Sequence, residues 1–460
     1  MRKTETEIIS RSSHNISRQL ISPNALKTLY RLRDNGFSAC LVGGCVRDLL
    51  LGRQPKDFDI ATDATPSQIK RTFRNCRLVG RRFRLAHLHF KDEILEVATY
   101  RATYIEAEPT DNNDNDEAVD EPAPAEHHHR HDHQVIKSEH GVILRDNLFG
   151  TAEEDAWRRD FTINALAYNI TDFSIVDYVG GMEDLRLGII RTIGDPLERF
   201  TEDPVRMLRA IRFAGLLEFT IEKHTWQALL EMADSIGRAS PARLFDELLK
   251  LLFCGEGEKC GFLLLQSGLL AAIFPNVEEW LGSRTACSLK GPFHKELAFV
   301  DSLCKSGRNV SPALLLALLF GEYLAAKGAV FLDRGARPQE SVDSAVAEFM
   351  QEISVRLMVP QKTVIRLREI LLLQQRFSRM PGRKPEAVTA RHGFSEALEY
   401  LRFTASSNHS LEKTCAWWER LAEKLPVVTG EGEAEEGAVV ATGSGRKRRR
   451  RRRGKKRQNV

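Results

Sequence analysis

Two aspartates separated by one residue, Asp57 and Asp59, are the side chains of this 460-residue chain best suited to hold a metal ion. The surrounding segment 58–63 (FDIATD) reads as a short strand, and residues i and i+2 of a strand point to the same face. Carboxylates on one face can share two Mg²⁺ ions about 4 Å apart, which activate a hydroxyl group and stabilise a leaving group. An Asp-x-Asp pair alone also fits an exposed polar turn, so its surroundings must decide.

A glycine pair, Gly43-Gly44, lies between a predicted buried strand at 37–42 and a predicted short helix. Such a turn directs backbone N–H groups and the helix dipole toward an anion. Arg47 follows in the first helical turn, where its guanidinium can hold a phosphate, and Asp48 can orient it. The glycine turn, the arginine and the Asp-x-Asp strand together predict a place where a nucleotide's phosphates meet metal ions.

These residues belong to a predicted mixed α/β domain. From about residue 204 to 425, apolar residues recur at three- and four-residue spacing, which predicts a helical remainder. The elements expected in the first domain are helices at 24–36 (capped by Asn24) and 66–73, and strands at 37–42, 58–63, 84–90 and 94–100.

The segment 43–62 (GGCVRDLLLGRQPKDFDIAT) resembles the signature of the class II nucleotidyltransferases, the superfamily of bacterial poly(A) polymerases and CCA-adding enzymes. Later segments resemble that family's motifs in the same order, and the resemblance covers residues 37–255. It implies a polymerase β-like mixed-sheet head, a helical neck and body, and template-independent nucleotide addition to RNA 3′ ends. The later motifs are 158–168 (RRDFTINALAY), 177–196 (DYVGGMEDLRLGIIRTIGDP) and 202–214 (EDPVRMLRAIRFA).

The resemblance implies a role for each matching residue. Two aspartates would hold the metal ions, and a third would complete the acidic site or bind the ribose. Besides this acidic group, a phosphate group of residues would hold the triphosphate. A base group of residues would read the incoming base or support the residues that read it. These groups are, in order, Asp57, Asp59 and Asp160; Gly43, Gly44 and Arg47, with Arg159 and Asn164 nearby; and Asp203 and Arg206, supported by Glu202 and Arg209.

Two of these assignments have rivals. Asp203 and Arg206 are neighbours on a helix and supply the acceptor and donor that a base edge requires. Asp203 can also be the cap of a helix that begins at Pro204. The third metal carboxylate can be Glu96, on the strand at 94–100, in place of Asp160.

The segment 78–90 (LVGRRFRLAHLHF) separates the two activities of the superfamily. It resembles the form typical of bacterial poly(A) polymerases, whereas CCA-adding relatives usually carry a Gly-Thr pair where this chain reads FRLAHL. The resemblance therefore implies AMP addition from ATP to the 3′ ends of mRNA and other RNAs, with a two-ion Mg²⁺ site. CCA addition to tRNA stays open as the alternative.

The charge of the chain is concentrated at its end. The segment 429–460 contains eleven basic and four acidic residues, so it carries +7, while the remaining chain carries −3. Such a basic tail favours sequence-independent contact with RNA phosphates. The segment 105–140 is acidic and rich in proline, and we expect it to be a disordered loop. We assign no role to its His-rich run at 127–133.

The composition fits a cytoplasmic enzyme. The N-terminus has no apolar signal core, and no apolar run is expected to be long enough to cross a bilayer, so we expect no membrane partner. Eight cysteines without a CxxC pair argue against a zinc site. The predicted domains are a catalytic head at 24–190, a neck at 191–255, a helical body at 256–428 and a disordered basic tail at 429–460.

Overall fold

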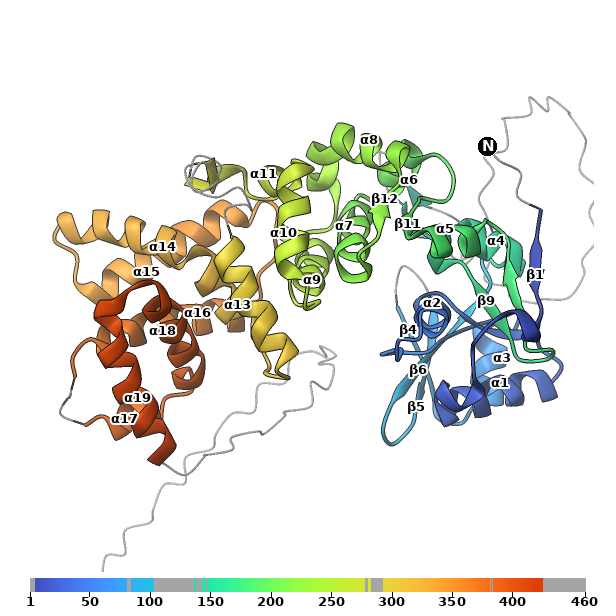
Figure 1. Cartoon of the computed structure of the whole chain (residues 1–460), viewed down its shortest axis with the longest axis horizontal. Helices are drawn as coiled ribbons and strands as arrows, with labels where there is room; N and C mark the ends of the chain where they lie inside the picture. Colours follow the sequence, from blue (N-terminus) through green and yellow to red (C-terminus); the bar gives the residue numbers. More distant parts are fainter. Residues whose placement is uncertain are drawn as a thin grey trace, which may run out of the picture.

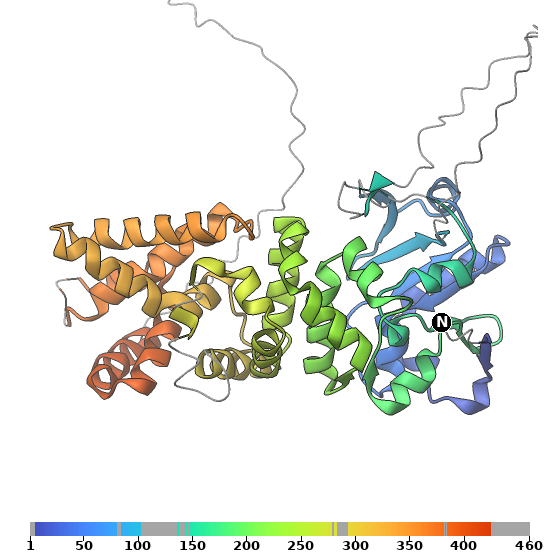
Figure 2. The same cartoon turned by 90° about the horizontal axis from the view of Figure 1, so that it is seen from above.

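The computed structural model describes residues 5–80, 84–102, 136–137, 143–145, 148–277, 280–282, 293–380, 382 and 384–424. Within them, a sheet-containing head lies at one end and helices extend from it to the other end (Figures 1 and 2). The predictions for the 105–140 loop, its His-rich run and the basic tail lie outside the described residues. One part of that loop segment is described: β7 (Ile136–Lys137), which pairs with β8 (Ile143–Arg145).

The head is built on one eight-stranded sheet. β3 and β6 run parallel, and the other neighbouring strands of this sheet run antiparallel. The predicted fold class, a mixed-sheet head followed by helices, is confirmed. From edge to edge the strands are β1 (Glu7–Ile9), β10 (Ile175–Asp177), β9 (Ala167–Asn169), β2 (Ala39–Val42), β3 (Asp59–Thr62), β6 (Ile94–Thr99), β5 (Leu85–His89) and β4 (Cys76–Val79).

The two faces of this sheet differ in polarity. Alternate strand residues point to opposite faces, and Ile60, Leu95 and Val97 are buried in the core. Asp59 and Glu96, on the other face, are exposed. The helices that pack against the sheet and share its core are α1 (Pro23–Asp34) and α3 (Pro66–Thr72).

The start of α1 corrects one sequence prediction. The Ser22 side chain accepts hydrogen bonds from the backbone N–H groups of Asn24 and Ala25, so Ser22, not Asn24, is the cap. Pro23 fits the first turn because that turn needs no N–H donor there. The helix therefore starts one residue earlier than predicted, at Pro23.

A buried carboxylate fixes the segment that follows β10. Asp177 is 1% exposed and accepts hydrogen bonds from four successive backbone N–H groups, those of residues 179–182. They lead into α5 (Gly181–Leu187), where a Cβ atom on Gly181 would lie 2.2 Å from the Thr162 carbonyl oxygen. Only glycine lets α5 pack this closely on the 3₁₀ turn η3 (Thr162–Asn164).

A helical neck follows the head. A two-stranded parallel pair joins the start of the neck to a segment in its middle: β11 (Ile189–Ile190) with β12 (Thr220–Ile221). α10 packs against both α7 and α9, across the domain boundary that we predicted at residue 255. The predicted domain limits stay predictions. The neck helices are α6 (Pro196–Glu202), α7 (Val205–Leu217), α8 (Lys223–Met232), α9 (Pro241–Leu252), α10 (Gly257–Gln266) and α11 (Leu269–Ile273).

The body surrounds one long apolar helix, α14. It is 22 residues long and apolar enough to cross a membrane, which corrects the expectation that no such run exists. Of its most apolar stretch, 56% is buried within the protein, as in the core helix of a folded domain. The body helices are α13 (His294–Lys305), α14 (Pro312–Asp333), α15 (Pro338–Ile353), α16 (Gln361–Phe377), α17 (Glu386–Thr389), α18 (Phe394–Ser407) and α19 (Glu412–Lys424).

Candidate active site

The glycine turn lies between β2 and α2 (Gly44–Leu50), and its conformation requires glycine. Gly43 has φ 78° and ψ −138°. A Cβ atom there would lie 3.0 Å from the Arg159 guanidinium and 4.0 Å from an Asp59 carboxylate oxygen. The turn therefore stands where a cation of the second motif and a carboxylate of the first motif approach each other.

Asp59 begins β3 and lies opposite Val42, the last residue before the turn. Asp57 precedes the strand, so only one of the two aspartates has the strand position that we expected. Loss of hydration raises the pKa of Asp59, and the negative charges of Glu96 and Asp57 raise it further. Asp59 is thus held among like charges that a cation would relieve.

Glu96 lies beside Asp59 in the same sheet. The parallel register of β3 and β6 pairs Asp59 with Glu96, which places their side chains on one face. His87 is next in this row, paired with Glu96 across β5, and its Nε2 lies 3.5 Å from a Glu96 carboxylate oxygen. The sequence offered Glu96 only as a rival, because strand register is not visible in the chain alone.

Asp160 lies in a different environment. It is 8% exposed and accepts hydrogen bonds from the Asn164 amide and from Arg209, whose nearest nitrogen is 2.6 Å away. Burial alone would raise the pKa of Asp160, but Arg209 and Asn164 outweigh it and lower the pKa to about 2. Its carboxylate is permanently charged and already neutralised by protein groups.

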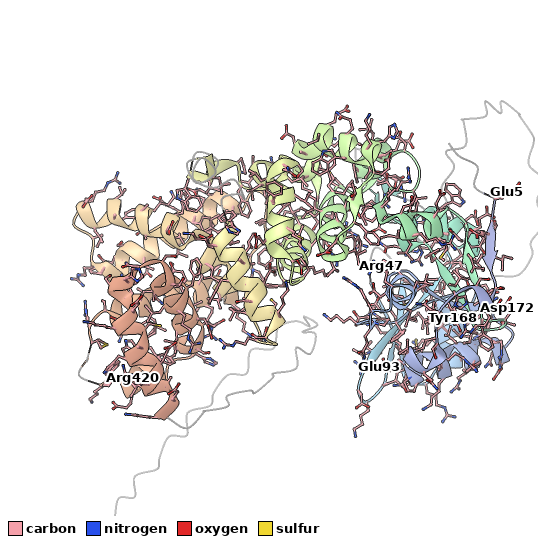
Figure 3. The ribbon with its side chains drawn as sticks, viewed as in Figure 1. Glu5, Arg47, Glu93, Tyr168, Asp172 and Arg420 are labelled. Atoms are coloured by element: carbon pink, nitrogen blue, oxygen red, sulfur yellow. The ribbon has the colours of Figure 1, made fainter. Side chains whose placement is uncertain are left out.

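Arg47 is also buried, at 4% exposed, and lies between the head and the neck (Figure 3). It donates to Asp48 at 2.7 Å and to the Asn164 side-chain oxygen at 2.6 Å. Its guanidinium carbon lies 4.9 Å from the centre of the Phe213 ring on α7. Asp48 orients Arg47 as expected, and the phosphate contact of Arg47 stays a prediction.

Arg159 is the cation that faces the glycine turn. Its guanidinium donates to Asp155 at 2.9 Å and toward the Asn164 carbonyl oxygen at 3.5 Å. Burial would lower its pKa, but the charges of Asp155 and Asp59 raise it above the ordinary value. Arg159 therefore keeps its positive charge beside Gly43, where an incoming phosphate would need it.

The predicted base readers lie where α6 ends and α7 begins. Asp203 accepts two hydrogen bonds from Arg243 of α9, at 3.0 and 2.7 Å. α7 begins at Val205 and the residue at its N-cap position is Pro204, so the predicted cap, Asp203, lies one residue before the cap position. Arg206 donates to Glu202 at 3.0 Å and to the Arg199 carbonyl oxygen at 2.9 Å. Both readers thus have fixed orientations and separate partners.

Helix α9 supplies two residues that the sequence analysis missed. Arg243 binds Asp203, and Glu247, 5% exposed, lies 2.7 Å from Arg212 and 3.9 Å from Arg209. The sequence analysis predicted only helical structure for this segment, from the spacing of its apolar residues. The available signal was the spacing of Arg243 and Glu247, which places two charged groups on one face of the helix.

Among the described residues, no three histidine, cysteine, aspartate or glutamate side chains form a preassembled metal site. Asp59 and Glu96 nevertheless share one sheet face, and the charge of Asp57 acts on Asp59. All three supply oxygen donors of the kind that Mg²⁺ prefers. Burial chiefly, and then the charges of Glu96 and Asp57, raise the pKa of Asp59, whereas Arg159 and Arg209 lower it. This donor set fits a divalent cation.

A mixed sheet with an acidic face, a glycine turn and an arginine beside it defines a nucleotidyltransferase-type site, and comparisons with known proteins agree. The chain matches family models described as "Poly A polymerase head domain" (residues 39–191), "Probable RNA and SrmB- binding site of polymerase A" (218–281) and "Polymerase A arginine-rich C-terminus" (334–457). It is 39% identical to poly(A) polymerase I of Salmonella typhimurium, over 91% of this chain and 86% of that protein. The chain belongs to the poly(A) polymerase family.

CCA-adding enzymes match this chain over a smaller part of their length, or at lower sequence identity, than the poly(A) polymerase of Salmonella typhimurium does. The enzyme of Leuconostoc mesenteroides is 33% identical over 56% of each chain. The crystal structure of Bacillus stearothermophilus CCA-adding enzyme in complex with CTP superimposes with a TM-score of 0.56 at 26% identity, and covers 88% of this chain and 82% of that one. The fold is shared with these enzymes, and sequence similarity along the whole chain favours the poly(A) polymerases.

Two glycine-to-alanine variants test the role of the glycine turn. Gly43→Ala should lower kcat/KM for ATP by about 100-fold, because its methyl group displaces Arg159 by a few tenths of an ångström and strains the turn. Gly52→Ala is the control, because Gly52 also has a positive φ of 68° but a Cβ there meets nothing within 4 Å. Steady-state kinetics and thermal unfolding of both variants measure this. Equal losses of activity in both would refute the role of the turn.

Proposed function

We propose that this chain is a polynucleotide adenylyltransferase that adds AMP from ATP to RNA 3′ ends without a template. The observation that carries the proposal is the register of Asp59 beside Glu96, one strand away from the glycine turn that Arg159 faces. This arrangement brings negative charge for metal ions and positive charge for a triphosphate to one edge of the sheet. Membership in the poly(A) polymerase family supports the same activity.

The triphosphate would lie at the glycine turn. Gly43 leaves room because it has no side chain, and the Arg159 guanidinium stands behind it. A phosphate there would compete with Asp59 for Arg159 and gain charge-assisted hydrogen bonds. Arg47 and Asn164 would act indirectly, since they bind each other at 2.6 Å and hold the turn against α7.

We propose that Asp57, Asp59 and Glu96 would hold two Mg²⁺ ions. Such ions lower the pKa of a bound hydroxyl group and neutralise charge on a leaving pyrophosphate. Glu96 replaces Asp160 as the proposed third carboxylate, because Asp160 is already bound by Asn164 and Arg209. The pKa of Asp160 is lowered because Arg209 and Asn164 stabilise its charged form.

The reaction is an in-line displacement. The RNA 3′ oxygen forms a bond to the α-phosphorus of ATP, the α–β phosphoanhydride bond breaks, and pyrophosphate leaves. Asp203 and Arg206 would select adenine by offering a fixed acceptor and a fixed donor to the base edge. Arg243 and Glu202 keep those two side chains oriented, so no nucleic-acid template is needed.

The family and the described structure fit a soluble bacterial enzyme, and we propose that it acts in the cytoplasm on mRNA and other RNAs. CCA addition remains the second candidate only through the shared fold. It would require the site to accept CTP and ATP in turn, and the chain matches CCA-adding relatives over about half its length.

Offering ATP or CTP with two RNAs tests the proposed function directly. With ATP and an unstructured RNA, we expect long adenosine tails, and with CTP alone little extension. A tRNA lacking its 3′ end serves as the comparison substrate. Addition that stops after three nucleotides, on tRNA alone and only with both nucleotides present, would contradict poly(A) synthesis and support CCA addition.

Substitution of the carboxylates tests the metal assignment. Asp57→Asn, Asp59→Asn and Glu96→Gln should each lower kcat by about 1,000-fold or more, because each removes a charged oxygen ligand. They should also weaken the binding of Mn²⁺ plus ATP in calorimetry. Asp160→Asn should mainly destabilise the fold and leave Mn²⁺ affinity within about threefold. The reverse result, with Mn²⁺ binding lost in Asp160→Asn and kept in Glu96→Gln, would show that Asp160, not Glu96, is the third metal carboxylate.

A further inference from the structure

A hollow of about 600 Å³ in the body is lined by the start of α15, the end of α16, α17 and the middle of α19. These helices lie far from the head (Figure 1). Five of the residues that line the hollow are basic, and none is acidic. They come from the start of α15, the end of α16 and the segment around α17, so they are brought together only by the fold. The basic lining residues are Arg337, Arg376, Arg379, Lys384 and Arg391.

Several other basic side chains of the body are held in ion pairs with acidic neighbours. Arg368 pairs with Asp343, Arg402 with Glu419 at 2.6 Å, and Lys327 with Glu352 at 2.6 Å. In the part of the body that the structure describes, no ion pair involves the side chains that line the hollow. Clustered like charges cost stability through mutual repulsion, which a bound polyanion would relieve.

The hollow is a built feature with fixed walls. The Gln375 side-chain amide donates to the Pro338 carbonyl oxygen at 3.1 Å and joins α16 to α15. Trp418 of α19 donates from its indole N–H to the Phe377 carbonyl oxygen at 3.2 Å and is 1% exposed. The apolar side chains of Leu372 and Val388 also line the hollow. Apolar surface beneath a rim of arginines suits a nucleotide, with its base on the surface and its phosphates on the rim.

We propose that this hollow binds the phosphodiester backbone of the RNA substrate, several nucleotides upstream of the 3′ end that enters the head. This inference rests on the proposed function, which makes RNA the polyanion present during catalysis. Since the hollow and the catalytic sheet lie at opposite ends of the molecule (Figure 1), only RNAs long enough to pass over the neck reach both. The hollow therefore adds affinity for long RNAs and contributes nothing to the chemical step.

The test compares charge reversals inside and outside the hollow in the full chain. The test variant is Arg376→Glu/Arg379→Glu, and a neutral version, Arg376→Gln/Arg379→Gln, guards against effects of the introduced acids. The matched control is Lys362→Glu/Lys413→Glu, two exposed positions on α16 and α19 that do not line the hollow. Thermal unfolding establishes that all of them fold.

Fluorescence anisotropy with a 30-nucleotide and a 6-nucleotide unstructured RNA gives the readout. We expect the test variant to bind the long RNA about tenfold more weakly. The slope of log K against the logarithm of the salt concentration should become smaller in magnitude by about 1.4, because two phosphate contacts are lost. Binding of the short RNA and AMP addition to it should stay within twofold of the unchanged chain, as should every property of the control. AMP addition to the short RNA by the unchanged chain reports on the proposed function separately.

Three results would overturn the proposal. Unchanged affinity for the long RNA would mean that the hollow does not hold RNA. Equal losses with long and short RNA would place the effect at the 3′-end site. Tighter RNA binding by the test variant would indicate that an acidic segment of this chain, such as EGEAEE at 431–436, occupies the hollow instead.

Discussion

An ion pair between the buried Asp160 of the head and the half-buried Arg209 of α7 joins the sheet-containing head to the neck. The two side chains approach to 2.6 Å, and Asp160 is only 8% exposed. Removing one partner of such a pair leaves an uncompensated buried charge, which costs about 3–5 kcal/mol. The orientation of α7 relative to the sheet is therefore set by this contact.

Other parts of the site depend on the same contact. Asn164 binds both Asp160 and Arg47, and Arg47 lies against Phe213, so the glycine turn is held to the same helix. Phe213 also packs edge-on against a head residue, Phe161, with ring centres 5.8 Å apart. A second ion pair, between Arg243 of α9 and Asp203, joins α9 to the segment before α7. The glycine turn and the segment that carries Asp203 thus belong to one connected set of polar contacts.

The sequence predicted the parts of this site that are local in the chain and missed those that the fold assembles. Gly43 and Asp59 were predictable because a positive-φ turn and an Asp-x-Asp pair are each set by a few adjacent residues. The neighbourhood of Asp59 and Glu96 depends on strand register, and the contact of Arg243 with Asp203 spans 40 residues. The expectation that no apolar run is long enough to cross a bilayer was wrong for α14, because a core helix that is largely buried can be as apolar as a membrane span.

The coupling between Asp160 and Arg209 tests the central claim most directly. A double-mutant cycle with Asp160→Asn and Arg209→Gln, measured as free energy of unfolding, should give about 1–3 kcal/mol of coupling at pH 7. Because the pKa of Asp160 is lowered to about 2, this stabilisation should be complete above about pH 4 and disappear as the pH falls toward 2. Additive effects of the two substitutions at pH 7 would contradict the claim that this pair holds the neck against the sheet.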